Sequence, residues 1–260
     1  MLAWRKPISE LVRCAPAAFE SAGDETGHVE TLPRGPPLDF LYDGRDSDCR
    51  ATAMMPFIME RLHTNEGAHS RDRMIASAAV LLREKGLTAT SFDEVIQHSD
   101  APRGSIYHHF PNGKAELVEE AVRFAGSYIA GSIERAAADG DPVSAVRDFT
   151  AAWRTTLEGS DFKAGCPVVA VAVESHDDAP QLATAAAGAF SLWQSVLEGL
   201  LRARGVSAAR ARRLATTTVA AMEGAVVICR AQRDIQPLTD VSRELEDLLA
   251  SALGNSGVKR

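Results

Sequence analysis

The segment Ser91–Lys114, SFDEVIQHSDAPRGSIYHHFPNGK, decides the fold of this chain. Ser91 and Glu94 stand in the spacing of a capping box, which predicts the start of a helix of about seven residues. A second short helix follows; we expect it to hold Pro102 in its first turn and to run through Phe110. Two short helices joined by a tight turn are typical of a helix-turn-helix, whose second helix enters the major groove of DNA.

Regular helical patterns flank this segment on both sides. The upstream helix starts near Arg71, is expected to end at Gly86, and carries an apolar stripe at helical spacing: Met74, Ile75, Ala78, Ala79, Leu81 and Leu82. Downstream, the helix-breaking residues 111–113 end the second short helix, and a long amphipathic helix follows. Its apolar face holds Leu117, Val118, Ala121, Val122, Ala125, Ile129 and Ile133. We expect this long helix to join two parts of the protein.

The rest of the chain is also expected to be helical. Aspartate and proline at 141–142 predict one helix start, and the expected helices cover 141–157, 165–174, 180–204, 207–233 and 239–253. Aromatic residues make up only 6% of a chain of 260 residues that is rich in alanine, which suits close helix packing. The prediction is an all-α fold: an N-terminal three-helix head with a helix-turn-helix, joined by the long helix to a helical C-terminal body. The predicted divisions are 1–68, 69–115 for the head and 116–255 for the body.

Residues 1–68 have no sustained helical period and contain stretches rich in Gly, Pro and Asp. Two interpretations remain open. The segment is a natural disordered extension, or translation starts later, at Met54, Met55 or Met59. We favour the later start.

The net charge of −7 is unusual for a protein that binds nucleic acid. Residues 1–70 hold 7 basic and 11 acidic side chains, 71–125 hold 7 and 8, and the remainder holds 14 and 16. Within 98–114, however, Arg103, Lys114 and three histidines face only Asp100. We therefore expect a nearly neutral head with one small positive surface, which makes few phosphate contacts.

The second short helix carries the side chains that are expected to meet DNA. Ile106 and Phe110 are four residues apart and should face the core of the head. Arg103 is the best candidate for reading a guanine, and Tyr107 and Lys114 suit phosphate contacts. The full predicted DNA-binding set is Thr90, Ser91, Arg103, Gly104, Ser105, Tyr107, His108, His109 and Lys114.

The run 103–110, followed by Lys114 and Leu117, resembles the recognition-helix signature of TetR-type repressors. The resemblance extends back through Ala78, Gly86 and 90–91, and the "PNGK" at 111–114 resembles the lincomycin-resistance (LmrA/YxaF-like) subgroup. In the body, 165–167, 223–225 and 230–234 are similar to the same subgroup. The resemblance implies a homodimer that binds double-stranded operator DNA and releases it when a small, often drug-like or aromatic, molecule occupies the body. The acidic balance and residues 1–68 depart from the usual pattern.

A mostly apolar cavity with a few polar anchors is the expected effector site. The candidate lining residues are Phe149, Trp153, Phe162, Cys166, Trp193, Met222 and Glu223, with Gln194 as a further polar anchor. Each of these side chains could instead be ordinary core.

The helices at 180–204 and 207–233 are the expected dimer surface. Small residues there permit close approach, at Ala185, Ala186, Ala189, Ala220, Ala221 and Gly224. Larger apolar residues would supply the buried area, at Leu192, Trp193, Val196, Leu200, Val219 and Val226. Two heads that read successive major grooves must lie about 34–36 Å apart, so the operator should be an inverted repeat. Packing within one chain is the alternative interpretation of these residues.

Other kinds of chemistry are weakly supported. His108 and His109 point about 100° apart on a helix, without a nearby third ligand, which disfavours a metal site. His176 with its two following aspartates fits a polar loop as well as it fits catalysis. Cys166 could be a redox-sensing thiol, but buried structural cysteine is commoner. We expect no enzymatic activity, no catalytic or metal residues and no cofactor. We expect no membrane association, and a cytoplasmic location.

Two rival functions stay open at this point. A helical small-molecule-binding protein or enzyme would keep the cavity and bind no operator. A structural DNA-binding protein would show shallow sequence preference and respond to no ligand. Activation instead of repression is also open.

Overall fold

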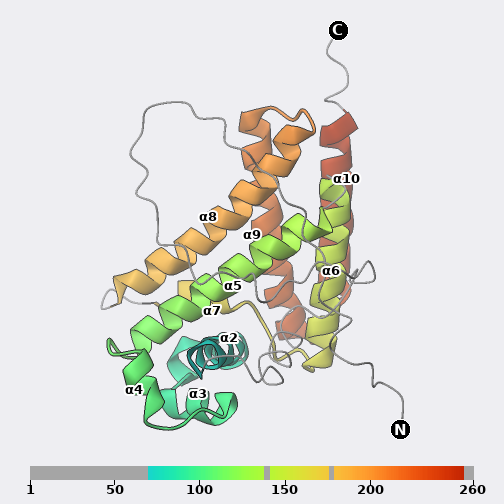
Figure 1. Cartoon of the computed structure of the whole chain (residues 1–260). Coiled ribbons are helices and arrows are strands. Elements are labelled where there is room, and N and C mark those ends of the chain that lie inside the picture. The colour runs from blue at the N-terminus through green and yellow to red at the C-terminus, as the bar shows by residue number, and fades with distance from the viewer. Residues whose placement is uncertain (1–69, 138–140, 176–178, 255–260) are drawn as a thin grey trace, which may run out of the picture. The chain divides into compact units, whose positions relative to one another are not determined.

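A computed structural model describes residues 70–137, 141–175 and 179–254, in which every regular element is an α-helix (Figure 1). The helices are α2 (Ser70–Ala89), α3 (Phe92–Ser99), α4 (Ser105–His109), α5 (Lys114–Ala136), α6 (Pro142–Gly159), α7 (Pro167–Glu174), α8 (Pro180–Ala203), α9 (Ala208–Gln232) and α10 (Gln236–Gly254). The prediction of an all-α fold is confirmed. The predictions for 1–68 and for His176 and its two aspartates lie outside the described residues.

Short-range sequence features determine where α2 is interrupted and where α3 begins. Gly86, at φ 84° and ψ 178°, interrupts the helical backbone inside α2, close to where the first helix was expected to end. Ser91 caps α3: its hydroxyl accepts a hydrogen bond from the Glu94 N–H, and the Glu94 carboxylate accepts one from the Ser91 N–H at 3.1 Å. This reciprocal pair confirms the predicted capping box.

The expected start of the second short helix was wrong. Pro102 lies in a turn before α4, and its carbonyl accepts bonds from the Ser105 N–H at 2.9 Å and the Ser105 hydroxyl at 2.7 Å. The helix therefore begins at Ser105 and ends at His109. The turn leaves Arg103 outside the helix, next to the Gly104 cap.

The body is built around α5, which packs most extensively on α8 (Figure 1). Gly126 permits this close approach, since a Cβ atom there would lie 2.7 Å from that of Ala189. The Trp193 indole N–H donates to the Gly126 carbonyl at 2.8 Å, which fixes the two helices to each other. Further packing joins α8 to α9, α9 to α10, and α10 to α6.

Most predicted body helices are present with small shifts at their ends. Asp141 caps α6 by accepting bonds from the N–H groups of Val143 and Ser144, as its position predicted. α7 begins at Pro167, two residues after the expected position, and α10 begins at Gln236, three residues before it.

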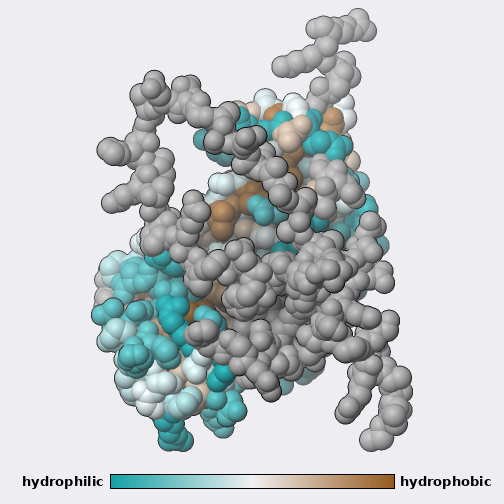
Figure 2. Space-filling view, in the orientation of Figure 1, coloured by the Kyte–Doolittle hydropathy of each residue, from teal (hydrophilic) through white to brown (hydrophobic). Residues whose placement is uncertain are grey.

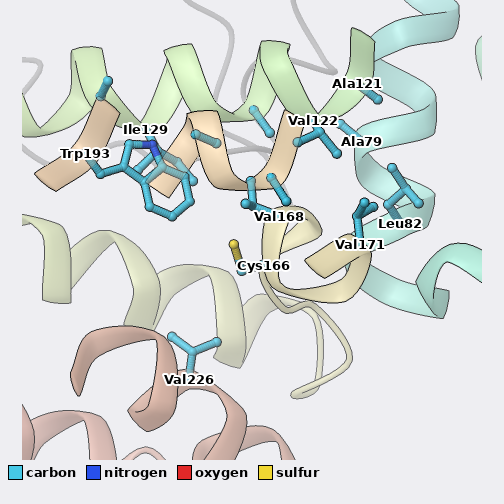
Figure 3. Close-up of a cluster of buried hydrophobic side chains, with 14 of the residues drawn as sticks. Ala79, Leu82, Ala121, Val122, Ile129, Cys166, Val168, Val171, Trp193 and Val226 are labelled. Atoms are coloured by element: carbon cyan, nitrogen blue, oxygen red, sulfur yellow. The ribbon is translucent and has the colours of Figure 1, made fainter. Parts of the chain in front are cut away.

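α7 packs one face against the hydrophobic core and contacts α2, α8 and α5, while its Val173 is exposed. Its Val168 and Val171 are fully buried, and Figure 3 shows them among side chains of α5 and α2, with Cys166 at the N-terminal end of the helix. Because α7 contacts both α2 and the body helices, a shift of α7 would change its contacts with both.

α9 is the one helix among the described residues that has the length and composition to cross a membrane. Half of its apolar window is buried inside the protein, where it packs on α8 and α10. Core helices of soluble proteins have the same character, so this helix is weak evidence for a membrane span.

Candidate functional site

Helix α4 presents a polar face to solvent while its apolar residues hold it to the head. Ile106 and Phe110 are completely buried, as the spacing predicted. Tyr107 is 67% exposed, and Arg103 and His108 are also exposed. The Tyr107 ring packs edge-on against Phe92 of α3, with the ring centroids 5.6 Å apart. The face is thus held in place by its apolar anchors and remains open for binding.

Arg103 and Gly104 are available to a partner. Arg103 has no ion pair or hydrogen bond among the described residues, so its guanidinium is free to bind an acceptor. A Cβ atom built on Gly104 would have no neighbour within 4 Å, so open space lies over the start of α4. The surface over α2–α4 is largely hydrophilic (lower left in Figure 2).

Three other predicted DNA-binding residues have roles within the chain. The Thr90 side chain is buried, and its hydroxyl donates to the Gly86 carbonyl at 2.7 Å, so it is not available to DNA. Ser91 is exposed and serves as the α3 cap. The Lys114 ammonium donates to the Leu87 carbonyl at 2.7 Å, and partial burial lowers its pKa. Two of its three donors remain for another acceptor.

His108 and His109 lie side by side with their rings at 60° and the centroids 5.4 Å apart. His109 is half-buried and its ring also contacts Phe110, whereas His108 is exposed. Across the described ranges, no group of three or more His, Cys, Asp or Glu side chains is placed to hold a metal ion.

An apolar cavity of about 410 Å³, part of it open to solvent, lies in the body. It is lined by Ile129, Ile133, Ala145, Val146, Phe149, Trp193, Leu197, Thr218, Val219, Met222 and Glu223. Four of these residues were predicted from the sequence: Phe149, Trp193, Met222 and Glu223. The aliphatic residues from α5 and α6 were missed, because an i, i+4 pair such as Ile129 and Ile133 also fits ordinary core.

The other predicted lining residues lie elsewhere. Trp153 is buried on α6 outside the cavity, and Phe162 is half-buried in the left-handed turn after α6. Gln194 points its amide to the Thr216 hydroxyl, at 3.3 Å. Cys166 is buried and acts on the cavity indirectly, through Glu223.

Of the described residues that line the cavity, Glu223 is the one with an ionisable side chain. Burial raises its pKa to about 7, against a smaller opposing effect of a hydrogen bond with Cys166. Burial, together with the nearby Glu223 charge, raises the pKa of the Cys166 thiol well above its ordinary value. A thiol that stays protonated is a poor nucleophile, which argues against redox sensing at Cys166.

Hydrogen bonds tie the helix-turn-helix region to the body. Glu174, the last residue of α7, accepts a bond from the Thr88 N–H at 3.0 Å. The N–H of Gly165, just before α7, donates to the Arg83 carbonyl at 2.9 Å. Both ends of the α7 segment therefore hold α2.

An exposed strip of small and apolar residues follows α8 and α9. Leu192 is 40% exposed, Val227 50% and Ile228 43%. A Cβ atom added at Gly188 or Gly224 would meet nothing within 4 Å, so packing within the chain does not require glycine there. Figure 2 shows apolar surface over α8. Several of the residues expected at a dimer surface are instead buried inside the chain: Ala185, Ala186, Ala189, Trp193 and Val226.

Two family models match this chain. The model of the tetR family of bacterial regulatory proteins matches residues 74–121, and that of the LmrA/YxaF-like transcriptional regulator C-terminal domain matches 142–244. An HTH-type transcriptional regulator of Mycobacterium tuberculosis is 41% identical over 189 residues, 70% of this chain and 95% of the relative. The chain belongs to the TetR family.

Further relatives support the LmrA/YxaF-like subgroup of TetR regulators. The HTH-type transcriptional regulator LmrA of Bacillus subtilis is 32% identical over 69% of this chain and 96% of its own length. A solved structure of a regulatory protein TetR from Rhodobacter sphaeroides has a TM-score of 0.60 at 26% identity, covering 68% of this chain and 97% of that one. The resemblance predicted from the sequence is confirmed, and the protein is a TetR-family transcriptional regulator with a DNA-binding helix-turn-helix domain.

Proposed function

We propose that this TetR-family regulator is a homodimeric repressor that binds an inverted-repeat operator and leaves it when a small apolar molecule occupies the cavity. The observation that carries this proposal is the exposed face of α4, held by the buried Ile106 and Phe110. The head then corresponds to 69–115 and the body to 116–255. In this account the protein is not an enzyme and acts in the cytoplasm, where the operator is.

In this proposal Arg103 reads a base and its neighbours set the register on DNA. An exposed guanidinium that has no partner in the described part of the chain can bind guanine through two hydrogen bonds. Tyr107 and Lys114 bind phosphates, and Gly104 lets the duplex come close to the backbone. The other polar residues of the surface contact the sugar-phosphate backbone of the DNA: Ser91, Ser105, His108 and His109. Thr90 has no side-chain role, because its hydroxyl is buried.

The dimer in this proposal forms through the exposed strip of α8 and α9. Leu192, Val227 and Ile228 supply apolar area, and glycines such as Gly224 let two copies of the helices come close. Two-fold pairing would hold two heads at the spacing of successive major grooves, about 34–36 Å or a multiple of it.

Release of DNA requires that the ligand bind the incompetent head spacing better than the competent one, and typical couplings are about 1–3 kcal/mol. α5 runs from the head into the cavity wall, where it contributes Ile129 and Ile133, which makes it one lever. α7 is a second link. Cys166 at its start contacts Glu223 on the cavity wall, and Glu174 at its end contacts Thr88 in the head.

Selection from a random duplex library with the full-length protein tests this proposal. We expect enrichment of an inverted repeat whose half-sites lie one or two helical turns apart. A library that stays unenriched, or that yields only an unpaired single site, contradicts the operator-binding dimer. Shallow enrichment without symmetry would instead support the structural DNA-binding alternative.

A further inference from the structure

The Glu223 carboxyl is an ionisable group that has no counter-charge among the described residues of the cavity wall. It is 9% exposed on the wall of an otherwise nearly apolar cavity, and no Lys, Arg or His side chain is among the described residues that line that cavity. Its Oε2 atom is buried without a hydrogen-bond partner among the described residues. The Cys166 thiol is the titratable group that bonds to this carboxyl. An unpartnered buried acceptor costs free energy and is uncommon in folded proteins.

We propose that the cavity takes a cationic amphiphile, an apolar body bearing one protonated amine whose ammonium binds Glu223 Oε2. This inference rests on the proposed function, because it names the chemical class of the effector of the same cavity.

The charge balance favours an amine over other polar groups. An ammonium supplies both the hydrogen-bond donor that Oε2 lacks and the positive charge that the buried carboxylate lacks. A ligand hydroxyl would donate the hydrogen bond to Oε2 but would leave the carboxylate charge uncompensated, so the gain in binding free energy would be smaller. A ligand carboxylate would meet repulsion from Glu223. Because a bare carboxylate is disfavoured by burial, the pKa of Glu223 in the empty cavity is about 7.

The other walls suit the apolar body of such a ligand. Ile129, Ile133 and Leu197 are aliphatic, and Phe149 and Trp193 offer aromatic rings to an adjacent cation.

Binding of the cation should also release protons. Glu223 is about half protonated at pH 7 in the empty cavity, and pairing with an ammonium favours its ionised form, so about half a proton passes from Glu223 to the buffer. The Cys166 thiol keeps its proton throughout, because its own pKa lies well above the ordinary value.

Isothermal calorimetry on the full chain at pH 7 tests the inference with naphthylmethylamine and its neutral isostere naphthylmethanol. We expect the amine to bind wild type about ten-fold more tightly than the alcohol, and its heat to depend on the ionisation enthalpy of the buffer. Glu223→Gln should lose about ten-fold in amine affinity and keep its alcohol affinity, which also shows that the variant is folded. Glu244→Gln, an exposed site on α10, is the matched control and should match wild type.

Equal affinity of wild type for amine and alcohol overturns the inference, as does absence of amine binding or an unchanged amine affinity in Glu223→Gln. Operator binding is measured separately by fluorescence anisotropy. If the operator binds and the amine does not, only this inference fails. If the amine binds through Glu223 and no operator is bound, the proposed repressor function fails and the ligand class stands.

Discussion

The Glu174 carboxylate at the end of α7 accepts a hydrogen bond from the Thr88 N–H at 3.0 Å, a contact between residues 86 positions apart. Burial acts to raise the pKa of Glu174, but the bonds from Thr88 and Leu87 and the charge of Lys114 hold it below its ordinary value. Since Thr88 follows the non-helical Gly86, this carboxylate holds the bend at the end of α2.

Replacing Glu174 with alanine should loosen the contact between head and body. The Thr88 N–H exchanges its carboxylate acceptor for water, and we expect the free energy of unfolding to fall by about 0.5–1.5 kcal/mol. Amide hydrogen exchange should rise around 86–90. Urea unfolding and exchange measure the two effects. The exposed Glu244→Ala is the control, and equal protection of 86–90 in both variants would refute this role for Glu174.

The exposed strip on α8 and α9 predicts a dimer that one charge can break. Val227 is 50% exposed in the single chain, so Val227→Glu should leave the fold intact and bury a charge only in the dimer. We expect the variant to sediment as a monomer at concentrations where wild type is a dimer. Ala250→Glu, at an exposed position of α10, should remain dimeric. A dimeric Val227→Glu protein would rule out this surface.

Glu223 predicts a specific dependence of stability on pH. Its folded pKa of about 7 lies above the ordinary carboxyl value of 4.5, so the folded state binds more protons between these values. Stability from this group is therefore complete below pH 4.5 and falls by about 3 kcal/mol as pH rises to 7.

Glu223→Gln isolates this effect, because glutamine stays neutral at every pH. As pH rises from 4.5 to 7, the free energy of unfolding of wild type should fall relative to that of the variant. Above pH 7 the difference should level off. Urea titrations at fixed protein concentration measure it. Parallel curves for the two proteins across this range would show that the carboxyl is not buried as described.

Features set by neighbouring residues were predictable from the sequence. The Ser91–Glu94 capping box and the Asp141 cap each depend on residues within three positions, and both are present. The start of α4 was not found, because Pro102 fits both a first helical turn and the turn that precedes Ser105. Local sequence does not separate those two arrangements.

Features set by packing were only partly predictable. Phe149 and Trp153 share α6, yet only Phe149 lines the cavity, because the arrangement of α5, α8 and α9 decides which side of α6 is open. The contact of Glu174 with Thr88 carries no local signal, since the two residues meet only when α7 packs on α2. Thr90 is also buried in the folded chain, where its hydroxyl donates to the Gly86 carbonyl.

Lys114 is expected to contribute equally to the binding of operator and of unrelated DNA. Its ammonium is held by the Leu87 carbonyl, so Lys114→Ala removes a phosphate contact and one tie between α5 and the head. We expect weaker binding to operator and unrelated duplex by a similar factor, with a shallower salt dependence. Lys114→Arg, which keeps the charge, should retain most of the affinity. A loss confined to the operator would assign Lys114 to base reading.

Operator recognition through the exposed face of α4 can be measured as the ratio of operator affinity to scrambled-duplex affinity. Fluorescence anisotropy of wild type, Arg103→Ala and the exposed α10 control Arg243→Ala on the selected inverted repeat measures this ratio. We expect Arg103→Ala to lose about 1–3 kcal/mol of operator preference per half-site and to bind the scrambled duplex nearly as wild type does, while Arg243→Ala matches wild type on both. An unchanged ratio in Arg103→Ala would show that this face of α4 does not read the operator.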